Sequence, residues 1–399
     1  MKVCFLSREY PWRQPCGGVG IYTHTMARAL ADQNCDVSVM TQSPDDNPQS
    51  ETTDSIRVIG LPFRPFPLLP RRLATFSVVE RSAWSQLMSD AVRTIAPADA
   101  PDVVEAPEMA GEALTLLRRG DRPPIVVRIH SGSSYNLKIR GALRWYHRPL
   151  FQAERQCLQL ADAVSAVSTF AREQQGEHFA LDLSRSHVTP NPVDTESFRP
   201  GGPRSGDASE ILFVGRLDAV KGFDTMPSII SNVLTMEPAT RFTLAGAEQK
   251  AVSSNQPEPS RSFLLSRLSP EHGRQVTFAR VSPREMPALY ARASVVLIPS
   301  RSEACPYSGL EAAACAIPIV GTRGTGVECV VRDGETGYLV DPTDAKATAT
   351  RLVELLKNPG RAESFGRAAR THVEQHYSFT VAAVRARELY AEIASKGPT

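Results

Sequence analysis

Short apolar runs recur along the chain, and most of them are separated by segments of helix length. Each run is too short for a typical helix and has the apolar composition of a buried strand. Strands are predicted at residues 3–6, 36–40, 56–59, 103–104, 125–129, 163–167, 211–214, 242–245, 276–278, 295–298 and 317–320. Strands that alternate with helices form a parallel sheet covered on both faces, so the pattern predicts an α/β protein.

The strand pattern is interrupted after residues 190–194, where the chain becomes rich in Gly, Pro, Arg and Ser up to about residue 209. Such a composition is typical of a linker. We therefore predict a first domain over residues 1–192, a linker over 193–209 and a second domain over 210–378. Residues 379–399 hold a final helix with no strand after it, which we expect to pack across a surface, back on the first domain.

Open parallel sheets bind ligands outside the carboxyl ends of their strands. Two such sheets predict two Rossmann-like domains that face a central cleft, with the ligand between them.

The chain has 399 residues, of which 42% are hydrophobic and 22% charged, as in water-soluble globular proteins. The formal net charge of +2 is too small to indicate nucleic acid as a partner. Seven cysteines without a CxxC pair favour neither a zinc knuckle nor a disulfide framework. No apolar stretch approaches the roughly 18–20 residues that cross a bilayer, and the first apolar run is too short for a signal peptide. We expect a cytoplasmic protein.

The loop after the strand at 211–214 carries Gly215, Arg216, Lys221 and Gly222, and a helix follows it. Glycine allows close backbone approach, and helix N–H groups with two cations favour a diphosphate. The spacing does not match a Walker loop. The alternative is a solvated loop whose cations face water.

A second group of residues follows the strand at 295–298. Glu303 lies at the end of the strand, and Glu311 lies within the next helix. Two carboxylates can accept hydrogen bonds from sugar hydroxyls, while the N–H groups around Tyr307 and Ser308 can bind phosphate oxygens. The alternative is a surface glutamate with a helix-capping partner.

These patterns together resemble the family 4 retaining glycosyltransferases of the GT-B fold. The resemblance rests on GRL at 215–217, KG at 221–222, the Glu303–Glu311 spacing, GTRGTGVE at 321–328, DGETGYLV at 333–340, NPVD at 191–194, GGVG at 17–20 and His130. It runs nearly from end to end of the chain, in the correct order.

The resemblance implies transfer of a sugar from a nucleotide diphosphate to a hydroxyl, with an acceptor-binding first domain and a donor-binding second domain. Arg216 and Lys221 would hold the donor pyrophosphate and stabilise its growing charge, and Gly215 would let the backbone approach it. Glu311 would bind the ribose, and Glu303 the transferred sugar.

In the first domain, the resemblance places His130 at the donor sugar near the reacting carbon. Gly17 and Gly18 would lie beneath the donor phosphates or beside the acceptor. The alternatives are an ordinary strand-end histidine with a backbone partner and a tight glycine turn.

The sequence departs from the family pattern at Cys305-Pro306, where a Phe-Gly pair or similar is common. Proline has no N–H, so its neighbours must supply the phosphate-binding amides. Asp45-Asp46 is not a DxD motif. We therefore expect no essential metal and no cofactor, since Arg216, Lys221 and helix N-termini can stabilise the leaving group. We also expect no protein general base, because the resemblance implies that the leaving phosphate deprotonates the acceptor.

Glu105 and Glu108 also follow a predicted strand. They are candidates for acceptor hydroxyls; the alternative is that they cap a helix or stay solvated.

Residues 64–72 and 138–148 mix cations with large apolar side chains. Such a mixture can bind a lipid-linked diphosphate or an anionic membrane, which would place the protein peripherally at the inner membrane face. The alternative is a proline-rich loop and a solvated helix face. The acceptor could then be a sugar, a lipid-linked group or a small molecule, and the oligomeric state is left open.

Two rival functions remain. One is another GT-B enzyme, such as a nucleotide-sugar epimerase or a phosphorylase, and the other is an inactive sugar-nucleotide-binding paralogue. The presence of His130, Arg216, Lys221, Glu303 and Glu311 favours the transferase.

Overall fold

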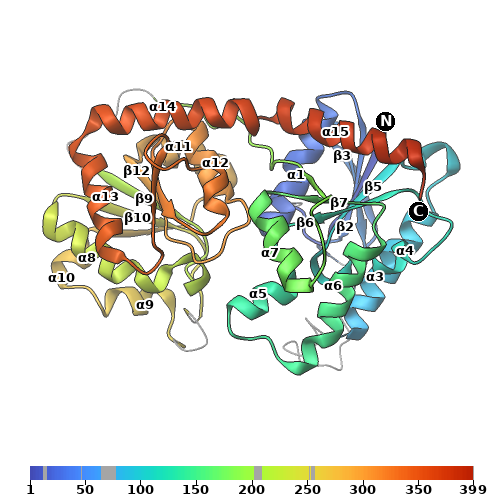
Figure 1. Ribbon diagram of the computed structural model, residues 1–399, viewed down its shortest axis with the longest axis horizontal. Coiled ribbons are helices and arrows are strands. Elements are labelled where there is room, and N and C mark those ends of the chain that lie inside the picture. The colour runs from blue at the N-terminus through green and yellow to red at the C-terminus, as the bar shows by residue number, and fades with distance from the viewer. Residues whose placement is uncertain are drawn as a thin grey trace. The chain divides into compact units, whose positions relative to one another are not determined.

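The computed structural model describes residues 1–11, 16–45, 47–63, 78–201, 209–250, 252 and 257–398. The basic segment 64–72, Asp46 and residues 202–208 of the predicted linker lie outside these residues. The chain divides into two compact units (Figure 1). Unit 1 is Met1–Lys138, Ala142–Pro192 and Phe379–Thr399, and unit 2 is Ile139–Gly141 and Val193–Ser378.

Unit 1 is built on an eight-stranded sheet in the order β3-β4-β2-β1-β5-β6-β7-β8. The strands are β1 (Lys2–Leu6), β2 (Asp36–Gln42), β3 (Gln49–Thr53), β4 (Ile56–Leu61), β5 (Val103–Pro107), β6 (Ile125–Ile129), β7 (Ala163–Ala166) and β8 (His187–Val188). All neighbours pair in parallel except β3 with β4. Strands β5 and β6 are buried at every position, and apart from Glu105 and Arg128 their residues are apolar.

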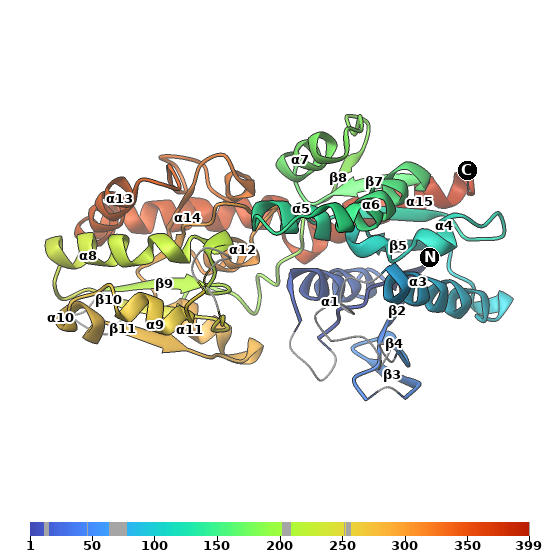
Figure 2. The ribbon, with the colours of Figure 1, turned by 90° about the horizontal axis from the view of Figure 1, so that it is seen from below.

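Helices of unit 1 lie on both sides of this sheet (Figures 1 and 2). They are α1 (Gly18–Ala31), α3 (Val78–Arg93), α4 (Leu114–Leu117), α5 (Ser133–Ile139), α6 (Arg148–Leu160), α7 (Thr169–Phe179) and α15 (Phe379–Lys396), with the 3₁₀ turns η1 (Pro97–Asp99), η2 (Met109–Gly111) and η3 (Trp145–His147). Helix α15 packs against α1 and β5 through a buried stripe that includes Ala386, Leu389 and Tyr390.

Unit 2 contains a six-stranded, all-parallel sheet in the order β11-β10-β9-β12-β13-β14. The strands are β9 (Glu210–Val214), β10 (Arg241–Ala245), β11 (Val276–Ala279), β12 (Val295–Ile298), β13 (Ile319–Thr322) and β14 (Gly337–Val340). The two sheets confirm the predicted α/β class of two parallel-sheet units.

The helices of unit 2 enclose an apolar core that includes Phe213, Phe242 and Leu352. Helix α8 packs against α13, and α12 packs against α14. The helices are α8 (Met226–Met236), α9 (Ser260–Leu265), α10 (Pro270–Arg274), α11 (Met286–Arg292), α12 (Tyr307–Ala314), α13 (Ala345–Lys357) and α14 (Pro359–His376), with η4 (Ala219–Lys221), η5 (Phe223–Thr225), η6 (Pro283–Glu285) and η7 (Gly326–Cys329).

Each of the eleven strands predicted from the sequence is found, with ends shifted by a few residues at most. Three short edge strands, β3, β8 and β14, were not predicted. Strand β3 has the sequence QSETT, so it carries no apolar run, and it lies at the edge of the sheet where one side faces solvent. Edge strands of this kind have no hydrophobic signature.

Helix α14 offers a matched test of its packing. A Cβ atom added at Gly366 would lie 2.0 Å from the carbonyl oxygen of Ala316, whereas one added at Gly360 of the same helix would meet nothing within 4 Å. We expect Gly366→Ala to lower the free energy of unfolding by about 1–3 kcal/mol through overpacking. Gly360→Ala should leave it unchanged or raise it by up to about 1 kcal/mol. Urea unfolding of both variants measures this; equal effects would contradict the packing seen here.

Candidate active site

The loop that follows β9 is organised around Asp218. This side chain is 5% exposed and caps the turn η4, where its carboxylate accepts the N–H of Lys221 at 3.2 Å. The same carboxylate accepts Nε of Arg216 at 3.0 Å. Asp218 therefore fixes the backbone that carries Lys221 and the side chain of Arg216.

Two backbone contacts hold this loop against the loop that follows β12. A Cβ atom at Gly222 (φ +72°) would lie 1.9 Å from the carbonyl oxygen of Pro299, so no other residue fits there. The N–H of Arg301 donates to the carbonyl of Val220 at 2.9 Å. Because β9 and β12 are neighbours in the sheet, their loops emerge side by side at its carboxyl edge.

This arrangement brings Lys221 to Glu303. The ammonium Nζ lies 2.6 Å from Oε1 of Glu303, and the hydroxyl of Ser300 donates to the same oxygen at 2.8 Å. The two side chains are partly buried, at 22% exposed for Lys221 and 10% for Glu303. A partly dehydrated ion pair of this kind is held more rigidly than one on an open surface.

Arg216 is more accessible, with 45% of its side chain exposed. Both predicted phosphate-binding cations thus have a carboxylate partner: Arg216 has Asp218, and Lys221 has Glu303. The sequence predicted a positively charged pocket, whereas the structure shows both cations in ion pairs at the edge of the sheet. Gly215 directly follows β9 there, and its carbonyl oxygen approaches Gly246 so closely that a Cβ atom on Gly246 would lie 1.9 Å from it.

Helix α12 begins at Tyr307, directly after Pro306 as its N-cap. Proline precedes the helix and does not interrupt it, because the N–H groups of Gly309 and Leu310 both bond to the carbonyl of Pro306 at 3.0 and 3.2 Å. Among the described residues no side chain caps this N-terminus. The first-turn amides of Tyr307 and Ser308 lie at the positive end of the helix dipole, where an anion is favoured.

Glu311 lies one turn further along α12 and is fixed by Tyr290, whose hydroxyl donates to Oε2 at 2.8 Å. Burial raises the pKa of the Glu311 carboxyl to about 7, and the Tyr290 hydrogen bond opposes part of that rise. Glu311 is therefore a carboxyl that changes charge near neutral pH.

In unit 1, Gly17 and Gly18 form the start of α1. The N–H of Gly17 donates to Oε2 of Glu9 at 2.9 Å, and a Cβ atom at Gly17 would lie 2.7 Å from that oxygen. A Cβ atom at Gly18 would meet nothing within 4 Å. Both glycines are exposed, and a side chain at Gly17 would only have to displace the flexible end of Glu9.

His130 follows the last residue of β6. Its N–H donates to both carboxylate oxygens of Glu108, at 2.9 and 3.0 Å, and its ring packs edge-on against Tyr22 with centroids 4.8 Å apart. Burial, assisted by the charge of Arg128, lowers the pKa of His130 well below its usual range. The imidazole is therefore neutral at physiological pH.

Glu105 and Glu108 are not where the sequence prediction placed them. They are 2% and 0% exposed, so they neither meet an acceptor in solvent nor stay solvated. Glu108 binds the backbone N–H groups of His130 and Ser131, and Glu105 accepts the hydroxyls of Tyr22 and Tyr390. Neither carboxylate caps a helix, so both readings of these residues were wrong.

The predicted residues therefore form two groups. Lys221 and Glu303 are in contact in unit 2, with the other unit 2 candidates at the same sheet edge or on α12, while Gly17, Gly18 and His130 belong to unit 1. Three supporting residues were missed: Asp218, Ser300 and Tyr290. Asp218 was detectable, since an aspartate just before a helical turn is a common N-cap. Tyr290 is 21 residues from Glu311, and no local pattern connects the two.

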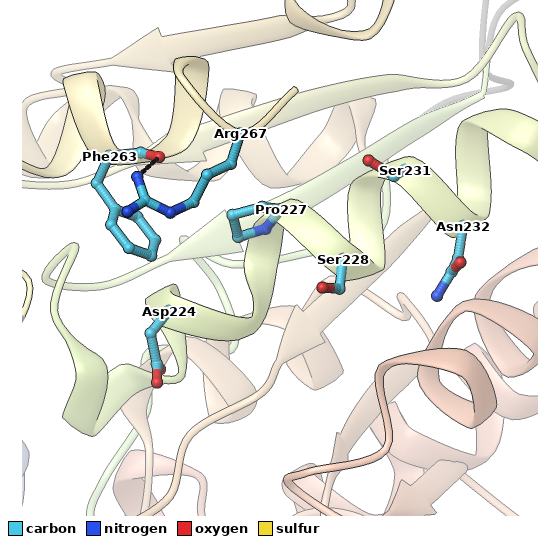
Figure 3. A pocket seen from close by; sticks show the side chains of 7 residues that line it. All are labelled: Asp224, Pro227, Ser228, Ser231, Asn232, Phe263 and Arg267. Atoms are coloured by element: carbon cyan, nitrogen blue, oxygen red, sulfur yellow. Dashed lines mark hydrogen bonds between the residues drawn. The ribbon is translucent and has the colours of Figure 1, made fainter. Parts of the chain in front are cut away.

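A shallow pocket of about 670 Å³ lies on unit 2 between α8 and α9 (Figure 3). The lining residues are Asp224, Pro227, Ser228, Ser231, Asn232, Phe263 and Arg267. The guanidinium of Arg267 lies over the Phe263 ring, 4.0 Å from its centroid, and so covers the one aromatic surface there. No predicted site residue lines this pocket.

Among the described residues, no three His, Cys, Asp or Glu side chains are placed to hold a metal ion. Within the same residues, no helix has both the length and the apolar character required to cross a membrane. All seven cysteines are free thiols.

The sequence matches two family models in succession. The model described as Glycosyltransferase Family 4 matches residues 16–197, and that described as Glycosyl transferases group 1 matches residues 194–372. The chain therefore belongs to the family 4 glycosyltransferases, which transfer a sugar from a nucleotide sugar.

Two curated glycosyltransferases are similar in sequence to this protein over nearly its whole length. A glycogen synthase of Mycobacterium tuberculosis is 27% identical over 412 residues, which cover 98% of this chain and 94% of the relative. A D-inositol 3-phosphate glycosyltransferase of Acidothermus cellulolyticus is 29% identical over 406 residues, covering 94% of this chain and 85% of the relative.

Solved structures show that the fold is GT-B. The sucrose-phosphate synthase of Thermosynechococcus elongatus superposes with a TM-score of 0.81 at 21% identity, covering 99% of both chains. The HepE protein of Anabaena in complex with UDP and glucose gives a TM-score of 0.69 at 17% identity, covering 98% of this chain and 99% of that one.

The buried carboxyl of Glu108 predicts a pH dependence of stability. Burial raises its pKa from 4.5 to about 8, opposed by the hydrogen bonds from Ser131 and His130. The folded state therefore keeps a proton that the unfolded state releases, so this contribution to stability is full below pH 4.5 and is lost as pH rises through about 8. The slope is at most about 1.4 kcal/mol per pH unit.

Glu108→Gln cannot titrate, so its free energy of unfolding should fall less than that of the wild type between pH 5 and 8.5. Denaturant unfolding at several pH values gives both slopes. The exposed Glu177→Gln on α7 is the matched control and should keep the wild-type slope. Equal slopes for Glu108→Gln and wild type would contradict the assignment.

Proposed function

We propose that this protein is a retaining, metal-independent glycosyltransferase that moves a hexose from a nucleotide diphosphate to a hydroxyl acceptor. The donor binds at the carboxyl edge of unit 2 and the acceptor at that of unit 1. The observation that carries the proposal is the partly buried Lys221–Glu303 pair, 2.6 Å apart, with the N-terminus of α12 following in the same loop.

The Lys221–Glu303 pair suits a sugar-nucleotide donor because each side chain can bind the donor while it keeps its partner. Lysine has three N–H donors, so Lys221 can keep Glu303 and still bind a phosphate oxygen. Both hydrogen bonds recorded for Glu303 reach Oε1, and none from the described residues reaches Oε2. Oε2 can then accept a hydroxyl of the transferred sugar.

The leaving diphosphate gains negative charge as the bond from the sugar carbon to its oxygen breaks. Lys221, Arg216 and the amides of Tyr307 and Ser308 stabilise that charge without reorganising, since each is already fixed. Glu311, aligned by Tyr290, binds the ribose hydroxyls. Gly215 and the glycines Gly17 and Gly18 allow backbone close to the donor.

Retention is proposed to follow a same-face displacement. The acceptor oxygen forms its new bond to the sugar carbon on the face from which the phosphate departs, and the acceptor proton moves to a leaving phosphate oxygen. No protein base is required. His130 lies near the reacting carbon, and because it is neutral it offers one N–H donor and adds no positive charge there.

The donor base and sugar are proposed from the relatives. Structures of HepE are solved with UDP and with UDP-glucose, and the relatives named above are a glycogen synthase and a D-inositol 3-phosphate glycosyltransferase. UDP-glucose is therefore the first donor to test by thermal stabilisation, with ADP- and GDP-hexoses beside it, because a bound donor raises the melting temperature. Sugars, small polyols and lipid-linked groups are the acceptors. The two rival functions would give different results in these assays. If the protein converted the donor in the absence of an acceptor, it would be an epimerase. If it bound the donor and showed no turnover, it would be an inactive paralogue.

Lys221→Gln tests the proposed function directly. It should lower kcat by roughly 100-fold or more, because one charged donor to the leaving group is lost in a partly dehydrated site. Lys357→Gln is the matched control: Lys357 also forms a 2.6 Å ion pair, with Glu237, on the surface of unit 2. Initial rates with the donor identified in the screen should fall only for Lys221→Gln. Equal rates for both variants would refute the phosphate role.

The same assay addresses the remaining parts of the mechanism. Rates should be unchanged by excess EDTA, and the anomeric proton of the product should show by NMR the configuration of the donor. A product with inverted anomeric configuration would overturn the retaining mechanism, and a rate that depends on added metal would overturn metal independence.

We further propose that unit 1 binds the surface of an anionic membrane, at the cytoplasmic face. Trp145 and Tyr146 are 87% and 58% exposed, more than any other large apolar side chain in the described part of the chain. Residues 122–153 contain no Asp or Glu, and the exposed Arg144 and Arg148 flank the aromatic pair. Exposed aromatic rings beside arginines suit the boundary between lipid headgroups and acyl chains.

Replacing Arg144 and Arg148 together by glutamine should weaken binding to anionic vesicles by roughly 30-fold, since each arginine near such a surface contributes about 1 kcal/mol. Co-sedimentation with phosphatidylglycerol-containing liposomes measures the partition. The double change Arg274→Gln/Arg284→Gln, at two exposed arginines of unit 2, should leave it unchanged. Wild-type binding no stronger than to neutral vesicles would refute the contact.

A further inference from the structure

Glu105 is a carboxylate enclosed within unit 1. It lies on β5, is 2% exposed, and has one hydroxyl donor for each oxygen: Tyr22 at 2.7 Å on Oε1 and Tyr390 at 2.6 Å on Oε2. Tyr22 belongs to α1 and Tyr390 to α15, so this carboxylate links the first helix of the unit to its last. Helix α15 packs against both α1 and β5.

Tyr22 is held on three sides. Its hydroxyl is bound by Glu105, the guanidinium of Arg128 lies over its ring at 4.0 Å from the centroid, and the imidazole of His130 packs edge-on against it at 4.8 Å. Arg128 is itself anchored, since it donates to the carbonyl of Thr189 at 2.9 Å and to Oδ1 of Asn191 at 3.2 Å. If the Tyr22 side chain turned away, its hydrogen bond to Glu105 and its contact with the Arg128 guanidinium would both be lost.

The backbone of His130 is fixed separately by Glu108. The Glu108 contact fixes the backbone of His130 but not the orientation of its imidazole. The contact with Tyr22 restricts that orientation. The packing of that imidazole depends on a chain of contacts that runs from His130 through Tyr22 and Glu105 to Tyr390.

A buried carboxylate is a costly way to hold two tyrosines, because apolar side chains of similar volume often stabilise a core as well or better. What a carboxylate supplies is direction: two hydroxyls must point at its two oxygens, which fixes both rings. A function that needs a defined ring orientation accounts for that cost.

We infer that Glu105 and Tyr390 are positioning residues for His130, so that the C-terminal helix takes part in transfer as well as in folding. The inference rests on the proposed function, in which His130 contacts the donor sugar. Glu105 and Tyr390 do not touch the substrate themselves; they act through Tyr22.

Tyr390→Phe removes one hydroxyl and keeps the ring. We expect it to lower kcat by roughly tenfold, since small displacements of a catalytic group are costly, while the Kd for the free nucleoside diphosphate, which binds unit 2, stays within twofold of wild type. Tyr338→Phe is the matched control: its hydroxyl also donates to a glutamate, Glu354, at 2.5 Å, but in unit 2. It should change kcat less than twofold. Glu105→Gln is the second variant if Tyr390→Phe does not fold.

The imidazole of His130 gives a readout that does not depend on activity. Its Cε1–H resonance, assigned with His130→Gln, should shift in Tyr390→Phe and stay in place in Tyr338→Phe. A lower melting temperature with unchanged kcat and an unmoved His130 signal would mean that the hydroxyl serves the fold only, and would overturn the inference. If the wild type transfers no sugar, the proposed function fails. The His130 signal then still tests the positioning: a shift in Tyr390→Phe supports it, and an unmoved signal refutes it.

Discussion

The contact on which the proposed donor site depends is the approach of Gly222 to the carbonyl of Pro299. Any Cβ atom at residue 222 would lie 1.9 Å from that oxygen, so a larger residue would force apart the loops that follow β9 and β12. These loops carry Lys221 and Glu303, which are 2.6 Å apart. An ion pair between long side chains is held in one geometry only if the backbones beneath it are fixed, and here a glycine fixes them.

Unit 1 holds its site loop by different means. Buried carboxylates bind the backbone there: Glu108 accepts N–H groups of His130 and Ser131, and Glu154 accepts those of Ala110, Ser133 and Ser134. Burial raises the pKa of both carboxyls, with the hydrogen bonds opposing it. The support of this loop therefore changes with pH.

The sequence was a good guide to the sheets and a partial guide to the site. Apolar runs identify strands that are buried on both faces, which is why the central strands were predicted and the polar edge strand β3 was not. Lys221 and Glu303 were singled out because family motifs mark them, and the structure shows that their side chains are in contact. Tyr290 was missed because its partner Glu311 is distant in sequence, and Glu105 was misplaced because a residue pattern does not show toward which side a carboxylate turns or what lies there.

The carboxylates beside Arg216 and Lys221 look, at first, like competitors for a diphosphate. They also do what a donor site requires. A cation held in place before the ligand arrives loses less conformational entropy on binding, and its field is oriented before charge develops on the leaving group. The cost is partial neutralisation of that field by Asp218 and Glu303. In the proposed complex the donor displaces water from the site, and the lower local dielectric strengthens the attraction between both cations and the diphosphate. Under the proposed function, the two ion pairs hold two otherwise flexible cations in place for a departing diphosphate.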